Sequence, residues 1–269
     1  MTTLRPYAAL FSMNAKQTFS YRSKAISGVL SQIFWGFMFL MMYKAFYASG
    51  NPPTDFSMLE LSTYIWLGQA FYAFSYVGNV PAITNPIIKG DVAYEFVRPI
   101  DLYFNWYFKN FAGRAVEALI RFLPIVILGF LLPAGIGLSL PVSVPAFLLF
   151  LASLILGGLM ASAIFMFICI FTFKTMSPKG VAAIVMVICN LFGGAYIPLP
   201  LMPAGVRRVL EYLPFRFMGD LPYRIYVGNV SLTSALIFIA IQIAWLVTLV
   251  LIGRVCLKKI IRNVEVQGG

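Results

Sequence analysis

The chain has 269 residues, of which 61% are hydrophobic and only 11% carry charge, whereas an ordinary soluble domain carries about 25% charged residues. A water-soluble fold cannot bury that much apolar surface, so the composition excludes a soluble globular protein and predicts a polytopic membrane protein. The net charge of +11 is spread between apolar runs and forms no single patch, which favours contact with anionic lipid headgroups over nucleic acid.

Residues 1–24 predict a helix that lies in the membrane interface. Apolar side chains recur there at the spacing of one helical face. Arg5, Lys16, Arg22 and Lys24 interrupt them, so the segment lacks the apolar centre of a cleavable signal peptide. We therefore expect the N-terminus to stay in the cytosol. A frayed cytosolic tail is the alternative.

Six apolar runs come after this segment, and most approach the roughly 20 residues that an α-helix needs to cross a bilayer. They cover residues 25–47, 59–80, 115–132, 144–171, 181–197 and 232–256. The third run contains Arg121 and Pro124, and the fourth is long enough to tilt. No repeat or linker divides the chain, so the sequence predicts one all-α membrane domain, residues 1–269, with six transmembrane helices.

Lys and Arg residues are divided unequally between the two sides of this scheme. Fifteen of the 20 fall in the N-terminal segment, in the second and fourth connections with their flanks, and in the C-terminal segment. The others are Lys44, Arg207, Arg208, Arg216 and Arg224. Because basic residues are enriched on the cytoplasmic side, this bias predicts that both termini are cytoplasmic.

Residues 84–100 predict a short helix between the second and third runs. Asn85 is placed to cap a helix that begins at Pro86, and Pro99 limits its far end. Such a helix would carry both charged and apolar side chains, as a docking element for a soluble partner needs. An ordinary solvated loop helix is the alternative.

Arg114, Glu117 and Arg121 are spaced three and four residues apart, so they share one face of a continuous helix. This spacing predicts a charge ladder at the inner membrane boundary. Lipid anchors that reach the interface are the alternative. A functional role is favoured if Arg121 lies deep, since buried charges require partners.

Prolines punctuate residues 198–230, which precede the last run. Pro198, Pro203 and Pro214 prevent a regular lipid-facing helix. After Pro203, apolar residues recur at i, i+3, i+4 and i+7 opposite charged ones, which predicts a short amphipathic helix, and a second is expected over 215–226. Together they predict an outer hairpin that dips into the membrane. A plain extracellular loop is the alternative.

No catalytic constellation is present. The sequence has no His, its nine carboxylates are scattered, and its three Cys lack the spacing of zinc ligands. No G-x-x-x-x-G-K-[ST] motif occurs, so the chain cannot cradle a nucleotide through a P-loop. We expect a non-enzymatic chain that binds no cofactor or metal, in which any ATP-driven work depends on another subunit.

The order of these elements resembles the permease subunits of ABC type-2 exporters over nearly the whole chain. Two local stretches carry the resemblance best: Ile88-Lys89-Gly90-Asp91 leading to Val97-Arg98-Pro99-Ile100, and Gly193-Gly194 leading through Pro198 and Met202-Pro203 to Leu213-Pro214. The chain looks most like the compact bacterial permeases whose ATPase is encoded separately. The resemblance places it in the bacterial cytoplasmic membrane.

In such permeases, residues 1–24 would form a connecting helix, 84–100 a coupling helix seated on the ATPase, and 198–230 a re-entrant gate. The ATPase-coupling residues would be Lys89, Asp91, Tyr94, Glu95 and Arg98. The gate would include Pro198, Pro203 and Pro214. The resemblance also implies two ABC ATPase subunits, which would bind ATP and Mg, and a second permease that is identical or related.

The cargo would pass between the two permeases along the second and fifth runs. Pathway candidates there are Tyr64, Gln69, Tyr72, Tyr76 and Asn190. Aromatic rings with a polar group suit a drug-like, peptide or lipidic amphiphile. The alternative function is a non-pumping membrane assembly or immunity factor that acts through its helices. An ion-driven carrier is disfavoured, because five of the runs lack central acidic residues.

Overall fold

The computed structural model describes residues 22–49, 56–92, 95 and 101–262, and within these it is all-helical, without a strand. The all-α prediction is therefore confirmed for these residues. In chain order the elements are α2 (Arg22–Ala48), α3 (Met58–Ala70), α4 (Tyr72–Ser75), α5 (Pro81–Lys89), α7 (Leu102–Leu131), α8 (Val144–Thr175), α9 (Pro178–Phe192), η1 (Leu199–Leu201), α10 (Ala204–Leu210), η2 (Pro214–Met218), α11 (Asp220–Tyr226) and α12 (Leu232–Ile261).

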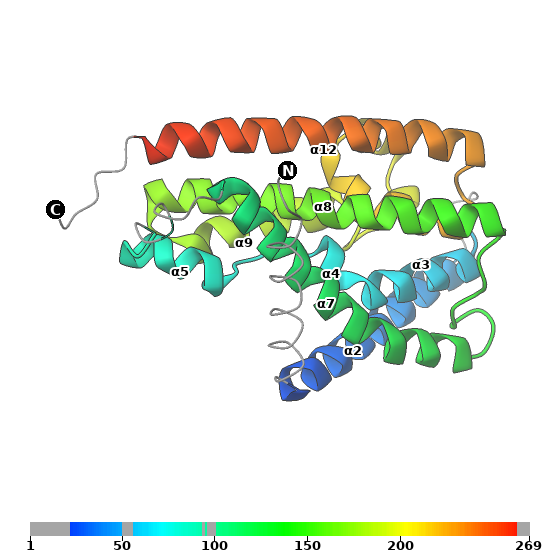
Figure 1. The fold of residues 1–269 in the computed structure, drawn as a ribbon. Helices are drawn as coiled ribbons and strands as arrows, with labels where there is room; N and C mark the ends of the chain where they lie inside the picture. Colours follow the sequence, from blue (N-terminus) through cyan, green and yellow to red (C-terminus); the bar gives the residue numbers. More distant parts are fainter. Residues whose placement is uncertain (1–21, 50–55, 93–94, 96–100, 263–269) are drawn as a thin grey trace.

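Helix α8 is the centre of the molecule, and α12 runs beside it in the same direction (Figure 1). Most of the apolar stretch of α8 is buried, whereas that of α12 is largely exposed, as expected for a helix with one side toward lipid. Gln242 of α12 is fully buried and donates to the carbonyl oxygens of Ser153 and Phe217 at 2.8 and 2.9 Å. These bonds join α12, α8 and η2.

Within the described residues, three helices are long and apolar enough to cross a membrane: Ile26–Ala48, Val144–Thr175 and Leu232–Ile261. Pro178–Phe192 is apolar but shorter. Helix α7 has the length of a span but carries charged residues in its middle. The structure therefore gives a helical membrane protein with three clearly apolar candidate spans, and the six predicted spans stay a prediction.

The second apolar run is not one helix, which corrects the expectation for residues 59–80. A capping box between Ser57 and Glu60 starts α3, but the helix ends at Ala70, and within this run only the single turn of α4 comes after it. Tyr76 and Val80 are extended. Pro81 explains part of this break, since proline disfavours a helical conformation at the preceding residue.

Helix α5 begins earlier than predicted, so Asn85 does not cap it. Its N-cap is Val80, Pro81 occupies the first turn, and Pro86 lies inside the helix. Proline fits the first turn because its missing N–H would have no partner there. The helix stops at Gly90, whose φ of 79° is favourable for glycine alone. The connecting helix predicted over 1–24 lies almost entirely outside the described residues.

Residues 198–230, called the hairpin segment, contain both predicted helical stretches. The first is α10, shorter than expected, and the second is divided into η2 and α11 at Gly219. Gly157 of α8 allows the backbone of η2 to approach, because a Cβ there would lie 2.9 Å from the carbonyl oxygens of Phe217 and Met218.

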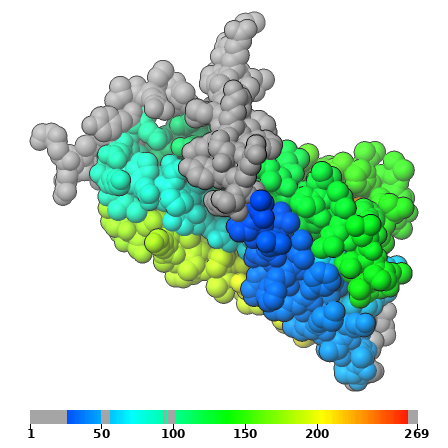
Figure 2. All heavy atoms as spheres, turned by 90° about the horizontal axis from the view of Figure 1, so that it is seen from below, coloured from blue at the N-terminus to red at the C-terminus, as the bar shows by residue number. Residues whose placement is uncertain are grey.

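On the face seen in Figure 2, α2 (dark blue) lies beside the C-terminal half of α7 (green). At the opposite end of α7, α5 packs against α8. The helices α2, α3, α4, α7 and α9 together with the hairpin segment surround a central cavity.

Candidate functional site

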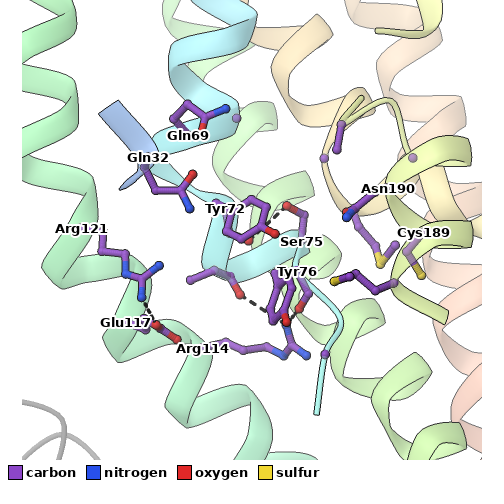
Figure 3. Close-up of a pocket in the computed structure, with 18 of the residues that line it drawn as sticks. Gln32, Gln69, Tyr72, Ser75, Tyr76, Arg114, Glu117, Arg121, Cys189 and Asn190 are labelled. Atoms are coloured by element: carbon purple, nitrogen blue, oxygen red, sulfur yellow. Dashed lines mark hydrogen bonds and ion pairs between the residues drawn. The ribbon is translucent and has the colours of Figure 1, made fainter. Parts of the chain in front are cut away.

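The central cavity has a volume of about 920 Å³, within the usual range of about 300–1,000 Å³ for ligand sites. Its lining includes all five pathway candidates, Tyr64, Gln69, Tyr72, Tyr76 and Asn190, as well as the three residues of the expected ladder, Arg114, Glu117 and Arg121. Figure 3 shows all of these except Tyr64, which it does not label, converging from α3, α4 and the residue after it, α7 and α9. Their roles in transport stay predictions.

The break in the second run lies in the wall of this cavity and is held by Arg114. Its Nη1 donates to the carbonyl oxygens of Tyr76 and Ala73, the latter at 3.3 Å, and its Nε donates to Asn110 Oδ1 at 2.6 Å. Helix ends leave backbone carbonyls without helical donors, and their partial negative charge attracts a cation. The buried guanidinium of Arg114 therefore clamps the end of α4.

The expected three-residue charge ladder is divided, which corrects that prediction. Glu117 forms an ion pair with Arg121, while Arg114 bonds the α4 carbonyls and Asn110 (Figure 3). The side chain of Arg121 is 12% exposed. Its guanidinium lies directly against Gly28 of α2, because a Cβ added at Gly28 would be only 2.6 Å from the Arg121 Cζ. Arg121 is therefore largely buried between α7 and α2, and its functional role stays a prediction.

Asn190 orders the turn at the end of α9. Its backbone carbonyl accepts from Ala195 and Tyr196 at 3.0 and 3.3 Å, and its side chain donates to the Tyr196 hydroxyl at 3.3 Å. Tyr43 of α2 donates to the Tyr196 carbonyl at 2.9 Å. The turn is thereby attached to α2, and it forms one wall of the cavity.

Tyr64 joins α3 to both the turn after α9 and the hairpin segment. Its hydroxyl lies 3.2 Å from the Gly194 carbonyl oxygen and 3.2 Å from Asp220 Oδ1, and its ring packs edge-on against Tyr223. Pro198 lines the cavity nearby. Pro203 and Pro214 instead begin α10 and η2 and do not line it.

Asp220 belongs to a buried charge cluster that the sequence analysis missed. Arg216 Nε and Arg224 Nη1 lie 3.7 and 3.6 Å from Asp220 Oδ2, and Arg224 Nη1 also lies 3.2 Å from Glu211 Oε1. The signal was available, because Arg216, Asp220 and Arg224 are spaced four residues apart. The prolines of the hairpin segment determined how it was interpreted, and the spacing of its charged residues was not used.

Of the expected coupling residues, Lys89 and Asp91 flank Gly90 at an exposed turn. Glu95 is partly buried and accepts a hydrogen bond from Trp106 Nε1 of α7, so it is tied to the chain itself. Tyr94 and Arg98 lie outside the described residues.

A sequence model of one family, described as ABC-2 family transporter protein, matches residues 33–268. A comparison with curated proteins found no match. The family match spans most of the chain, and it includes every helix that lines the cavity except the start of α2. Proteins of this family are membrane components that take part in transport and are not themselves catalytic. The chain therefore belongs to the ABC-2 family of transporter proteins.

Proposed function

We propose that this chain is the permease subunit of an ATP-driven exporter and that the central cavity is its half of the route taken by the cargo. The observation that carries the proposal is the composition of the cavity wall. Tyr, Gln and Asn side chains stand there beside aromatic rings and only a few charges. Such a wall suits an amphiphile, since ring faces contact its apolar part and hydroxyls and amides bind its polar part.

The proposed topology has six crossings with both termini in the cytoplasm of a bacterial cell. Helix α5, the last turn of α8 and the last turn of α12 lie toward one end of the molecule (Figure 1). This end carries Lys89, Lys174 and Lys258. The enrichment of basic residues on the cytoplasmic side supports this end as the inner one. In this topology α3 with α4 and the 15-residue α9 cross as short or broken helices, which is tolerated where they line a cavity.

Family membership implies an ATPase partner, and we assign its docking to the turn around Gly90. Two ATPase subunits would bind ATP and Mg, and their closure would move α5. Lys89 and Asp91 are exposed there, so they are available to a partner. A second permease, identical or related, would complete the route. A non-pumping membrane factor would need neither partner.

Co-purification and transport test the proposal together. The full chain is extracted from its native membranes in a mild detergent, and the eluate is assayed for ATP hydrolysis and for its mass. We expect two ATPase and two permease subunits. The complex, in proteoliposomes, should then move a fluorescent amphiphile in an ATP-dependent manner. A chain that elutes without an ATPase would overturn the proposal.

The charge-reversed pair Lys89→Glu/Asp91→Lys is the variant for coupling. It should lose the ATPase from the eluate, whereas Lys258→Glu/Lys259→Glu, two exposed residues at the end of α12, should keep it. Equal retention by both variants would remove the Gly90 turn as the docking site and would leave the exporter assignment itself intact.

A further inference from the structure

A second, smaller cavity of about 320 Å³ lies in the hairpin segment and shares no lining residue with the central cavity. It is lined by Pro200, Arg207, Arg208, Glu211, Arg224 and Asn229. Three guanidinium groups therefore share one cavity with a single carboxylate. This composition indicates a site for an anion.

Two of these three guanidinium groups, those of Arg207 and Arg208, are not balanced by the buried charge cluster of Glu211, Arg216, Asp220 and Arg224. Glu211 and Asp220 are balanced by Arg216 and Arg224, with N–O distances between 3.2 and 3.9 Å. Each carboxylate contacts both guanidinium groups, so the four side chains together carry no net charge. Glu211 is thereby held within the cluster, and its carboxylate is already bound.

Arg207 and Arg208 carry the excess. Within the described part of the chain, neither guanidinium has a carboxylate oxygen within 4.0 Å. Arg207 donates only a long bond, 3.5 Å, to the Pro200 carbonyl. Two guanidinium groups thus line the cavity without a counter-charge, although such groups bind phosphate or carboxylate oxygens through paired N–H donors.

The opposite side of α10 is apolar and exposed. Val206 and Val209 are 50% and 63% exposed, and the ring of Tyr212 lies beside Phe238 of α12 at a centroid distance of 6.5 Å. Trp245 of α12 donates to the Tyr212 carbonyl at 2.8 Å. The apolar side of α10 therefore continues onto the exposed apolar side of α12, which lipid chains cover in a membrane.

We propose that this cavity binds the phosphate group of an anionic membrane lipid, whose acyl chains lie along α10 and the first half of α12. Charge complementarity selects the headgroup, because Arg207 and Arg208 add two positive charges to a neutral cluster. The apolar surface on the other side of this seven-residue helix favours a lipid, whose acyl chains can pass around α10, over a soluble phosphate compound. The site is independent of the ATPase, the cargo and the direction of transport.

Lipid binding to the purified full chain tests the site. The chain is delipidated in a neutral detergent and titrated with phosphatidylglycerol or phosphatidylcholine, and bound lipid is counted by native mass spectrometry. We expect one phosphatidylglycerol to bind at least tenfold more tightly than phosphatidylcholine. Arg207→Gln/Arg208→Gln should abolish that preference. Lys258→Gln/Lys259→Gln, which removes two exposed charges from the far end of α12, should keep it.

Each other outcome overturns the proposal. Equal losses in the two double variants would mean general charge attraction, and an unchanged preference in Arg207→Gln/Arg208→Gln would place the lipid elsewhere. Inorganic phosphate at the same concentration should not compete, and full competition would assign the cavity to a soluble anion. If the double variant fails to fold, Arg208→Gln alone serves, since that side chain is exposed. It should reduce the preference several-fold.

Discussion

Lys109 Nζ lies 3.3 Å from the carbonyl oxygen of Ala82 and donates to it, which links α7 to α5. Pro86 lies four residues after Ala82 and has no N–H, so that carbonyl lacks its usual helical donor. Lys109 supplies the donor from another helix. Because Lys109 and Ala82 also line the central cavity, their bond connects α5 with the cavity wall.

Replacement of Lys109 by Met should loosen α5 without unfolding the protein. An exposed hydrogen bond from a charged donor contributes at most about 1 kcal/mol, so the melting temperature should fall by only a few degrees. Amide hydrogens of α5 should exchange faster. Lys174→Met is the matched control, because Lys174 is exposed at the end of α8, and it should leave exchange in α5 unchanged. Unchanged exchange in Lys109→Met would show that the bond does not hold α5.

Loss of Arg114 should be more damaging. Arg114→Met leaves the carbonyls of Ala73 and Tyr76 and the side chain of Asn110 without their donor, and unfolding should become easier by about 3 kcal/mol. Arg114→Lys keeps the charge but offers fewer directed donors, so it should recover only part of this loss. Unfolding curves in detergent measure both. An Arg114→Met protein as stable as the parent would contradict the clamp on α4.

Gly28 and Gly113 form a matched pair of helical glycines. An added Cβ at Gly113 meets nothing within 4 Å, so Gly113→Ala should stabilise its helix by about 0.5–1 kcal/mol. At Gly28 the same change meets the Arg121 guanidinium and should displace it from Glu117. Gly28→Ala should therefore gain nothing or lose stability, as unfolding curves in detergent would measure. An equal gain in both variants would show that Arg121 moves freely.

A double-mutant cycle measures the bond between Tyr64 and Asp220. Tyr64→Phe and Asp220→Asn should each destabilise the protein, and the double variant should lose about 1 kcal/mol less than the sum, because the two side chains interact. Tyr223→Phe is the control for Tyr64→Phe, since it removes a hydroxyl from the neighbouring ring. Additive losses in the cycle would mean that Tyr64 bonds Gly194 instead.

The long helices could be predicted because hydrophobicity alone determines them. The runs at 144–171 and 232–256 lie within α8 and α12, which carry no charged residue before Lys174 and Arg254 respectively. The end of α3 at Ala70 could not be predicted, since the apolar residues Phe71 to Phe74 come directly after it. The break depends on Arg114, which lies about forty residues away in the chain and binds the freed carbonyls.

The structure brings the predicted pathway residues to the wall of one cavity, but their role in transport stays a prediction and the cause of the cavity was not predicted. Aromatic hydroxyls and amides in two apolar runs identified Tyr64, Tyr72 and Asn190 as a group. Spacing along one helix misled the interpretation of Arg114 and Glu117, because it considers only neighbours on the same helix. Proline was ambiguous in the same way, since Pro81 and Pro86 both fit the first turn of a helix and only the folded chain distinguishes them.

The buried amide of Gln242 holds α12, α8 and η2 together, whereas α3 is attached to the hairpin segment by weaker hydrogen bonds. Because the bonds of Gln242 lie in an apolar interior, separating α12 from α8 and η2 would leave the Gln242 amide, the Ser153 hydroxyl and carbonyl, and the Phe217 carbonyl without these hydrogen bonds and away from water. The contacts of Tyr64 across the cavity are weaker by geometry, with both oxygen–oxygen distances at 3.2 Å. Widening of the cavity would therefore begin between α3 and the hairpin segment, while α8 and α12 keep their positions relative to each other.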